Sequence, residues 1–96
     1  MLMKKRLKTI NYSRTFLKQL KKSPLEIKIA FRKRLELFIE NSFEPQLNNH
    51  PLTGRFSGYR SFNVSGDWRA IFSEYEEETD KIVIFEVIGT HSQLYK

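Results

Sequence analysis

The sequence predicts a single α+β domain: a small, mostly antiparallel sheet of about four strands, covered on one face by a two-helix hairpin. Three observations lead to this fold class. The chain has 96 residues, which is enough for one domain (residues 1–96) and too few for two. Hydrophobic residues make up 40% and aromatic residues 14% of the chain, which supports a compact core rather than disorder. The hydrophobic patterning predicts a strand, then two helices, then three strands.

The N-terminal part of the chain predicts a strand followed by a short helix. Residues 5–11 alternate weakly between hydrophobic and polar side chains, as a strand does. Ser13 can cap the helix that follows. Lys21 and Lys22 end this helix, where positive charge is favoured by the helix dipole.

A second helix is predicted to begin close behind the first. Ser23 and Glu26 have the spacing of a capping box, with Pro24 at the first helical position. We expect the helix to run to about Asn41. Hydrophobic residues recur at three- and four-residue steps, which gives the helix one side that faces the sheet. These residues are Ile27, Ala30, Phe31, Leu35 and Phe38.

The second half of the chain predicts three strands after an irregular segment. Proline, asparagine and glycine make residues 42–57 a run of turns. Gly66-Asp67 forms a tight connection between the first two strands, and the acidic residues 76–80 form a solvated hairpin loop before the third. The third strand is nearly all hydrophobic, as is typical of a central strand. The predicted strands are residues 59–65, 68–72 and 81–88.

Charge is distributed unevenly along the chain. The net charge is +6, but residues 1–34 carry +11 and residues 35–96 carry −5. A one-sided basic surface suits a polyanion such as nucleic acid or the ribosome, or an acidic partner protein. A lysine-rich helical face exposed to solvent explains the same charge without any partner, and charge alone leaves both interpretations open.

Composition excludes several classes of function. The chain has no cysteine, so disulfides, thiolate metal sites and cysteine nucleophiles are ruled out. It also has no hydrophobic run with the length of a membrane span or the pattern of a secretory signal. We therefore expect a soluble, cytoplasmic protein.

Both histidines lie in polar segments where solvent can reach them. His50 precedes a proline in the irregular segment, and His91 follows the last predicted strand. Accessible imidazoles suit acid–base catalysis near neutral pH, although each can equally be an ordinary surface side chain or a cap. Asp67 would complete a two-histidine, one-carboxylate metal site, but no local ligand motif supports one. We expect neither a metal nor another cofactor.

The remaining candidate residues suit contact with RNA. Arg55, Arg60 and Arg69 are the only arginines after residue 34, and their planar guanidinium groups match phosphate oxygens. Pairing with nearby glutamates is the alternative for these arginines. Tyr95 is a candidate for stacking on a base, whereas Trp68 fits better in the core. RNA carries its own nucleophile, the 2′-hydroxyl, so its cleavage requires a base, an acid and cations facing the phosphorane.

Four segments of the chain resemble the RelE/ParE toxin superfamily, and in particular its YafQ-like branch of type II toxin–antitoxin systems. They are residues 50–54 (HPLTG), 58–60 (GYR), 66–69 (GDWR) and 89–92 (GTHS), the last with an aromatic residue at position 95. The predicted order of elements also fits a RelE-like fold over the whole chain. The resemblance implies a ribosome-dependent, metal-independent mRNA endoribonuclease that acts on mRNA in the ribosomal A site. It also implies a cognate antitoxin protein as partner, and it leaves the oligomeric state open.

The resemblance assigns roles to residues at matching positions. His50, Asp67, His91 and Tyr95 fall on functional positions of the branch. His91 would be the general acid, His50 or Asp67 the base or an orienting group, and Tyr95 a stacking platform. Asn63 stands where the branch often has a histidine. An asparagine hydrogen-bonds RNA but transfers no proton at neutral pH.

Two other functions are compatible with the same fold. One is inhibition of DNA gyrase, as in ParE-like relatives, in which case both histidines would be incidental. The other is a module that binds RNA or a protein through its basic half without catalysis.

Overall fold

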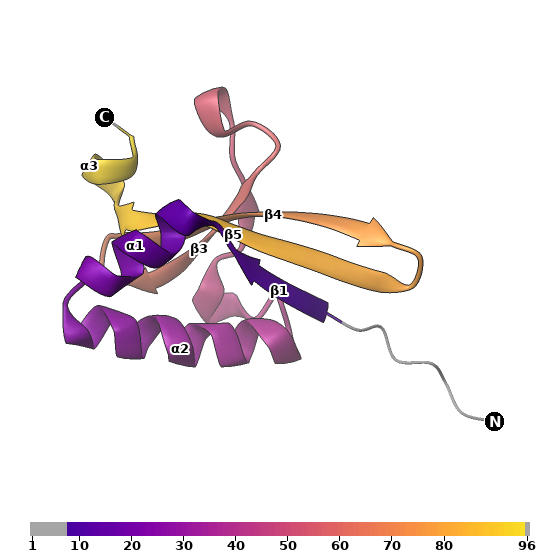
Figure 1. The fold of residues 1–96 in the computed structure, drawn as a ribbon, viewed down its shortest axis with the longest axis horizontal. Helices are drawn as coiled ribbons and strands as arrows, with labels where there is room; N and C mark the ends of the chain where they lie inside the picture. The colour runs from indigo at the N-terminus through magenta and orange to yellow at the C-terminus, as the bar shows by residue number, and fades with distance from the viewer. Residues whose placement is uncertain (1–7, 96) are drawn as a thin grey trace.

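The computed structural model describes residues 8–95, which form a sheet with α1 and α2 packed on one of its faces (Figure 1). The predicted α+β class and order of elements are confirmed. The helices are α1 (Arg14–Lys22), α2 (Leu25–Glu40) and α3 (His91–Leu94), with 3₁₀ turns η1 (Pro45–Leu47) and η2 (Gly54–Phe56). The strands are β1 (Lys8–Tyr12), β2 (His50–Pro51), β3 (Arg60–Ser65), β4 (Trp68–Glu77) and β5 (Asp80–Thr90).

The sheet has five strands in the order β1-β5-β4-β3-β2. Strand β1 pairs in parallel with β5, and the other neighbours are antiparallel. The strand beyond the predicted four is β2, which is only two residues long and therefore has no alternating pattern to detect. The predicted N-terminal strand is confirmed from Lys8, while its residues 5–7 lie outside the described part of the chain.

Phenylalanine dominates the core between the helices and the sheet. Phe85 of β5 lies at its centre and is fully buried. Five other phenylalanine rings surround it with centroid distances of 5.3–6.0 Å. Aromatic pairs of this geometry add about 1 kcal/mol each beyond the burial of area. The surrounding rings belong to Phe16, Phe31, Phe38, Phe62 and Phe72.

Helix α1 continues the sheet edge where β1 ends. The pairing of β1 with β5 stops at Phe85, so the next backbone groups of β5 need other partners. The Ser13 hydroxyl donates to the Glu86 carbonyl (2.7 Å), and the Gln19 side-chain oxygen accepts from the Ile88 amide (2.8 Å). Ser13 also caps α1, as predicted, because its Oγ accepts from the Phe16 amide at 2.9 Å.

The start of α2 differs from the prediction. Pro24 is the N-cap residue, and no side chain caps the helix, so the predicted capping box is wrong. Ser23 instead belongs to the end of α1: its hydroxyl donates to the Gln19 carbonyl at 2.8 Å, and its amide donates to the Leu20 carbonyl. The link between the two helices is too short for one serine to cap both. The end of α2 at Glu40, with Asn41 as C-cap, agrees with the prediction.

Strands β4 and β5 form a hairpin that extends beyond β3. The last pair between β3 and β4 is Arg60 with Phe72, whereas β4 and β5 remain paired as far as Glu77 with Asp80. The acidic residues predicted to form a loop therefore lie mostly at strand ends, and the turn itself is Glu78-Thr79. None of the helices within residues 8–95 is long and hydrophobic enough to cross a membrane.

Replacing Ser13 by alanine tests the link between α1 and β5. Ser13→Ala removes the helix cap and leaves the Glu86 carbonyl without its donor. The two losses together should lower the free energy of unfolding by about 2 kcal/mol and the Tm by roughly 10 °C. Thermal unfolding followed by circular dichroism measures this change. Ser57→Ala, in an exposed loop, is the control and should leave the Tm unchanged; equal Tm values for both variants would contradict the assigned role.

Candidate active site

Several predicted site residues share the face of the sheet opposite the phenylalanine core, which we call the second face. His50 lies opposite Ser61, and Ser61 lies opposite Ile71. One row further along the strands, Asn63 lies opposite Arg69. Paired residues project to the same side of a sheet, and alternate residues of one strand do so too. The side chains of His50, Asn63 and Arg69 therefore project from the second face.

The loop between β2 and β3 and the C-terminal helix α3 meet above this face. Both rise on the side of the sheet away from α2 (Figure 1). The ring of Phe56 lies edge-on to that of Tyr95, with 5.4 Å between the centroids, and edge-on to that of Tyr59 at 6.4 Å. The guanidinium carbon of Arg55 lies 5.1 Å from the centre of the Phe56 ring. The two segments therefore contact each other directly through aromatic rings.

A capping box fixes the orientation of α3. The Thr90 hydroxyl accepts from the Gln93 amide (3.2 Å), and the Gln93 side chain accepts from the Thr90 amide (2.8 Å). Gly89 makes this arrangement possible, because a Cβ at that position would lie 2.9 Å from Gln93 Oε1. Leu94 is buried and anchors the other side of the helix. The pattern Thr-x-x-Gln was visible in the sequence as a capping signal.

This short helix holds His91 against Tyr95 and Asp67. The rings of His91 and Tyr95 have centroids 4.6 Å apart, and the Tyr95 amide donates to the His91 carbonyl. The His91 amide donates to the Asp67 carbonyl at 2.9 Å, which ties the start of α3 to the turn between β3 and β4. His91 and Asp67 are both exposed. A substrate can therefore reach the imidazole, while its backbone is fixed from two directions.

His50 has a defined tautomer. Its Nδ1 lies 2.6 Å from the Asn48 carbonyl oxygen, and a carbonyl can only accept, so the proton lies on Nδ1. In the neutral ring Nε2 then carries a lone pair and can accept a proton. Asn48 has φ of 49°, in the left-handed region, which bends the chain so that its carbonyl faces the imidazole.

The arginines have different surroundings. Arg69 donates to the Gly66 carbonyl (2.8 Å) and to its neighbour's carbonyl, so its guanidinium stays near the β3–β4 turn. Arg60 instead donates to Asn49 Oδ1 (2.8 Å) and lies over the ring of Phe43. Arg60 pairs with the buried Phe72 and so projects to the core side of the sheet. The structure therefore does not bring Arg60 to the second face.

The side-chain oxygen of Asn63 is an acceptor to which no group donates a hydrogen bond within the described residues. This atom, Oδ1, is buried. Buried polar atoms are nearly always paired, so this oxygen is suited to accept from a ligand. Across the same described range, no three histidine or acidic side chains lie close enough together to hold a metal ion.

Two aromatic residues of this site were not identified from the sequence. Phe56 and Tyr59 line the second face together with Tyr95. Phe56 lies in the segment predicted to form turns, and Tyr59 was predicted only as the first residue of a strand. Aromatic residues between glycines and serines, as in Gly54-Arg55-Phe56-Ser57-Gly58, were the available signal. Turn formation does not require aromatic side chains, so their presence in such a segment indicates that they pack against another part of the protein or bind a ligand.

The fold is that of the RelE/ParE-like toxins. A YoeB/ParE toxin from Agrobacterium tumefaciens has the same fold, with a TM-score of 0.71 over 86% of this chain and 98% of that chain, at 10% identity. The sequence model described as "bacterial toxin of type II toxin-antitoxin system, YafQ" matches residues 8–96. The chain therefore belongs to the YafQ toxin family.

Similar proteins from Escherichia coli support this assignment. The crystal structure of E. coli YafQ matches with a TM-score of 0.73 and 27% identity, covering 93% of this chain and 99% of that chain. YafQ in the E. coli DinJ-YafQ toxin–antitoxin complex matches with a TM-score of 0.70 and 28% identity over 93% and 98%. The E. coli protein named mRNA interferase toxin YafQ is 43% identical over 47 residues, which is 49% of this chain. The match spans 47% of that relative, about half its length.

Changing Gln93 tests whether the capping box positions the His91 ring. Gln93→Leu removes the acceptor of the Thr90 amide and should cost about 1 kcal/mol of local stability. Gln93→Glu keeps an acceptor at the same place and should behave like the native protein. We expect nuclear Overhauser contacts between the His91 and Tyr95 rings to persist in Gln93→Glu and to weaken in Gln93→Leu. Undiminished contacts in Gln93→Leu would show that the box does not hold the ring.

Proposed function

We propose that this protein is a cytoplasmic toxin that cleaves mRNA in the ribosomal A site, as a metal-independent endoribonuclease. The observation that carries the proposal is the convergence of His91, Tyr95 and Asp67 with the loop above the second face. Family membership supports it, since E. coli relatives are named mRNA interferase toxins. Action on the ribosome is inferred from the resemblance of the sequence motifs to the YafQ-like branch.

The proposed reaction uses the 2′-hydroxyl of the RNA as nucleophile. His50 acts as the base, because its Nδ1 hydrogen bond to Asn48 leaves Nε2 able to accept the 2′-hydroxyl proton. The 2′-oxygen then attacks the adjacent phosphorus, and the 5′-oxygen leaves. His91, in its protonated form, donates the proton that the leaving oxygen needs. Asp67 positions His91 through its backbone carbonyl, which accepts from the His91 amide and fixes the start of α3.

The remaining residues bind the RNA. Tyr95 offers a ring for base stacking beside the His91 imidazole. Arg69 and Arg55 supply positive charge for the phosphorane, whose charge grows in the transition state. Asn63 contributes its unpaired oxygen as an acceptor for an RNA donor. Arg60 acts at a distance by holding Asn49, the residue before His50.

Removing either imidazole should abolish most of the cleavage. Acid–base catalysis contributes roughly 10²- to 10⁴-fold, so His91→Ala and His50→Gln should each lower the rate of cleavage by a factor in that range. The rate is measured as loss of intact message in a translating extract with purified toxin. Ser92→Ala, beside His91 on α3, is the control and should cleave normally. Normal cleavage by His91→Ala would rule out the assigned general acid.

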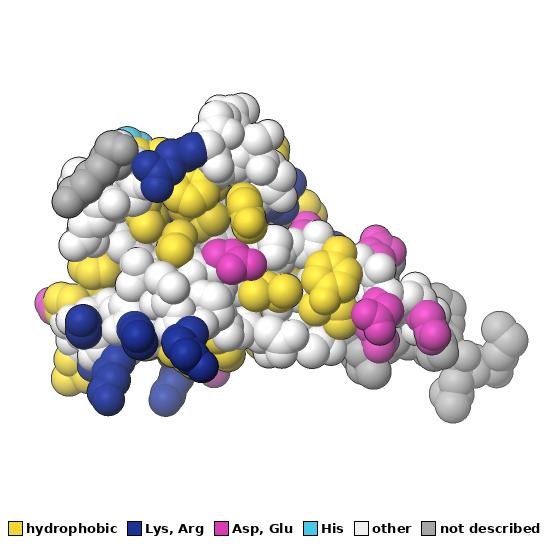
Figure 2. Space-filling view, turned by 45° about the horizontal axis from the view of Figure 1, so that its top comes forward, with side chains coloured by type: hydrophobic (Ala, Val, Ile, Leu, Met, Phe, Trp, Pro, Cys, Tyr) yellow, Lys and Arg dark blue, Asp and Glu magenta, His cyan; other side chains and the backbone are white. Residues whose placement is uncertain are grey.

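We propose that the partner of this toxin is a cognate antitoxin that docks in the groove between α1 and α2. E. coli YafQ was solved in complex with DinJ, a toxin–antitoxin pair. The groove has a volume of about 440 Å³ and is lined by Leu17, Leu20 and Phe31. The cations that line it come from both helices, and Figure 2 shows Lys and Arg side chains gathered on the helical side of the molecule, at the lower left. The lining cations are Lys21, Lys28 and Arg32.

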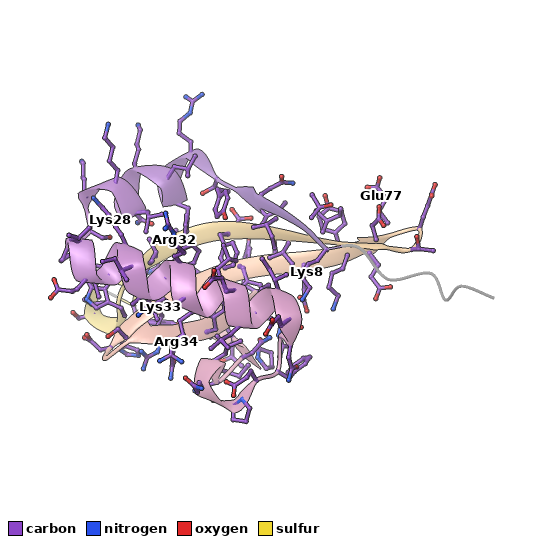
Figure 3. All side chains as sticks on the ribbon, turned by 90° about the horizontal axis from the view of Figure 1, so that it is seen from below. Lys8, Lys28, Arg32, Lys33, Arg34 and Glu77 are labelled. Carbon is purple, nitrogen blue, oxygen red and sulfur yellow. The ribbon has the colours of Figure 1, made fainter. Side chains whose placement is uncertain are left out.

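An acidic, amphipathic helix matches this groove in both respects. Its hydrophobic side would cover Leu17, which is 51% exposed, and its acidic residues would meet the cations. Lys28 and Arg32 lie on the side of α2 toward α1, and Arg34 lies on the other side (Figure 3). Lys28 and Arg32 make no ion pair within the described residues, so their charge is available to a partner.

Reversing two charges tests this docking surface. Lys28→Glu combined with Arg32→Glu should raise the Kd for the co-expressed antitoxin about tenfold or more, because the acidic partner is then repelled. Lys33→Glu, on α2 but outside the groove, is the control and should have a much smaller effect. Isothermal titration calorimetry at several salt concentrations measures both. An unchanged Kd for the double variant would place the antitoxin elsewhere.

A further inference from the structure

A cavity of about 390 Å³ opens on the second face, next to the cluster around His91 but separate from it. Its walls come from the loop residues Arg55, Phe56 and Tyr59, and its base includes Ile71, which is fully buried. The volume falls in the range of small-molecule sites. The only acidic residue in the lining is Glu86.

A β-bulge directs Glu86 into this cavity. Ile71 pairs with Val87 and Phe72 pairs with Phe85, so Glu86 has no partner in the ladder. As a result, Glu86 and Val87 both face the second face, where simple alternation would have turned one of them to the core. The Ser73 hydroxyl donates to Glu86 Oε2 at 3.3 Å and holds the carboxylate in place. Bulges of this kind commonly re-aim a side chain near a functional site.

The cavity is connected to the catalytic cluster through aromatic rings. Phe56 lines the cavity and contacts Tyr95, and Tyr95 in turn contacts His91, with centroid distances of 5.4 and 4.6 Å. The rings thus form a continuous path from the cavity to the imidazole, along which an RNA bound at His91 can extend. The described lining has one acidic side chain, Glu86, and one basic side chain, Arg55, so it carries no excess positive charge for a phosphate, whereas its aromatic walls suit a base.

We propose that this cavity is a subsite for a guanine base of the RNA, which rests on the proposed function and extends it to base selection. A carboxylate only accepts hydrogen bonds. Guanine presents two adjacent donors, N1–H and the N2 amino group, which match the two carboxylate oxygens of Glu86. Adenine, cytosine and uracil each place an acceptor next to their donor. Phe56 and Tyr59 supply the aromatic surface that unstacked RNA bases prefer.

Binding of RNA that cannot be cleaved tests the subsite directly. The probes are 2′-fluoro RNA heptamers of uridine with guanosine, adenosine, cytidine or uridine at the centre, since the fluorine removes the nucleophile. We expect the native protein to bind the guanosine heptamer about tenfold or more tightly than the other three, as measured by fluorescence anisotropy. Equal affinities, or a preference for another base, would overturn the proposal.

Two substitutions of Glu86 assign the preference to its carboxylate. Glu86→Gln presents an amide donor to one of the guanine donors, and Glu86→Asp withdraws both oxygens by one methylene. Each should reduce the guanosine preference to about twofold or less, with the Tm of both variants measured to verify folding. Glu77→Gln removes the same charge at the far end of the β4–β5 hairpin (Figure 3) and should keep the preference. A preference that survives both Glu86 variants would overturn the assignment.

The same measurements separate the subsite from catalysis. A guanosine preference in binding without His91-dependent cleavage would refute the proposed function and leave the subsite standing. His91-dependent cleavage without any guanosine preference would refute the subsite alone.

Discussion

The burial of Phe85 at the centre of five other phenylalanine rings is the constraint on which the rest of this structure depends. It fixes which residues of β5 face the core, and the bulge after it allows Ile88 to return to the core while Glu86 and Val87 face the other way. The end of β5 in turn sets where Gly89 and α3 begin. The positions of His91 and Tyr95 thus follow from the register of one hydrophobic strand.

Much of the fold could be predicted because each strand and helix carries a pattern of its own. The alternation of residues in Trp68–Phe72, for example, is enough to put Ala70 and Phe72 in the core and Ile71 on the opposite face, as the structure has them. Features that depend on contacts between elements could not be predicted from the pattern of any single element. Ser23 has the sequence context of a cap, but the end of α1 uses its hydroxyl. The bulge at Glu86 arises from pairing between strands and leaves no mark in the sequence of either one.

The same distinction applies to the site. The contact between His91 and Tyr95 follows from their spacing of four residues once a helix forms there. The placement of Arg60 also followed from parity, because it lies two residues before the buried Phe62 on the same strand and so shares its face. Grouping Arg60 with Arg55 and Arg69 because all three are arginines leaves out which face of the strand Arg60 occupies. The contact of Phe56 with Tyr95 joins the β2–β3 loop to the end of α3, and nothing in the sequence of either segment indicates this contact.

The part of β4 beyond β3, Ser73–Glu77, has a consequence for behaviour in concentrated solution. No strand within the described chain pairs with its outer edge, so its backbone groups there remain open to a strand from another molecule. Three of its five residues are glutamates: Glu74, Glu76 and Glu77. Two copies brought together along this edge would set like charges side by side. Charge repulsion between these glutamates therefore opposes the edge-to-edge pairing by which exposed edge strands aggregate.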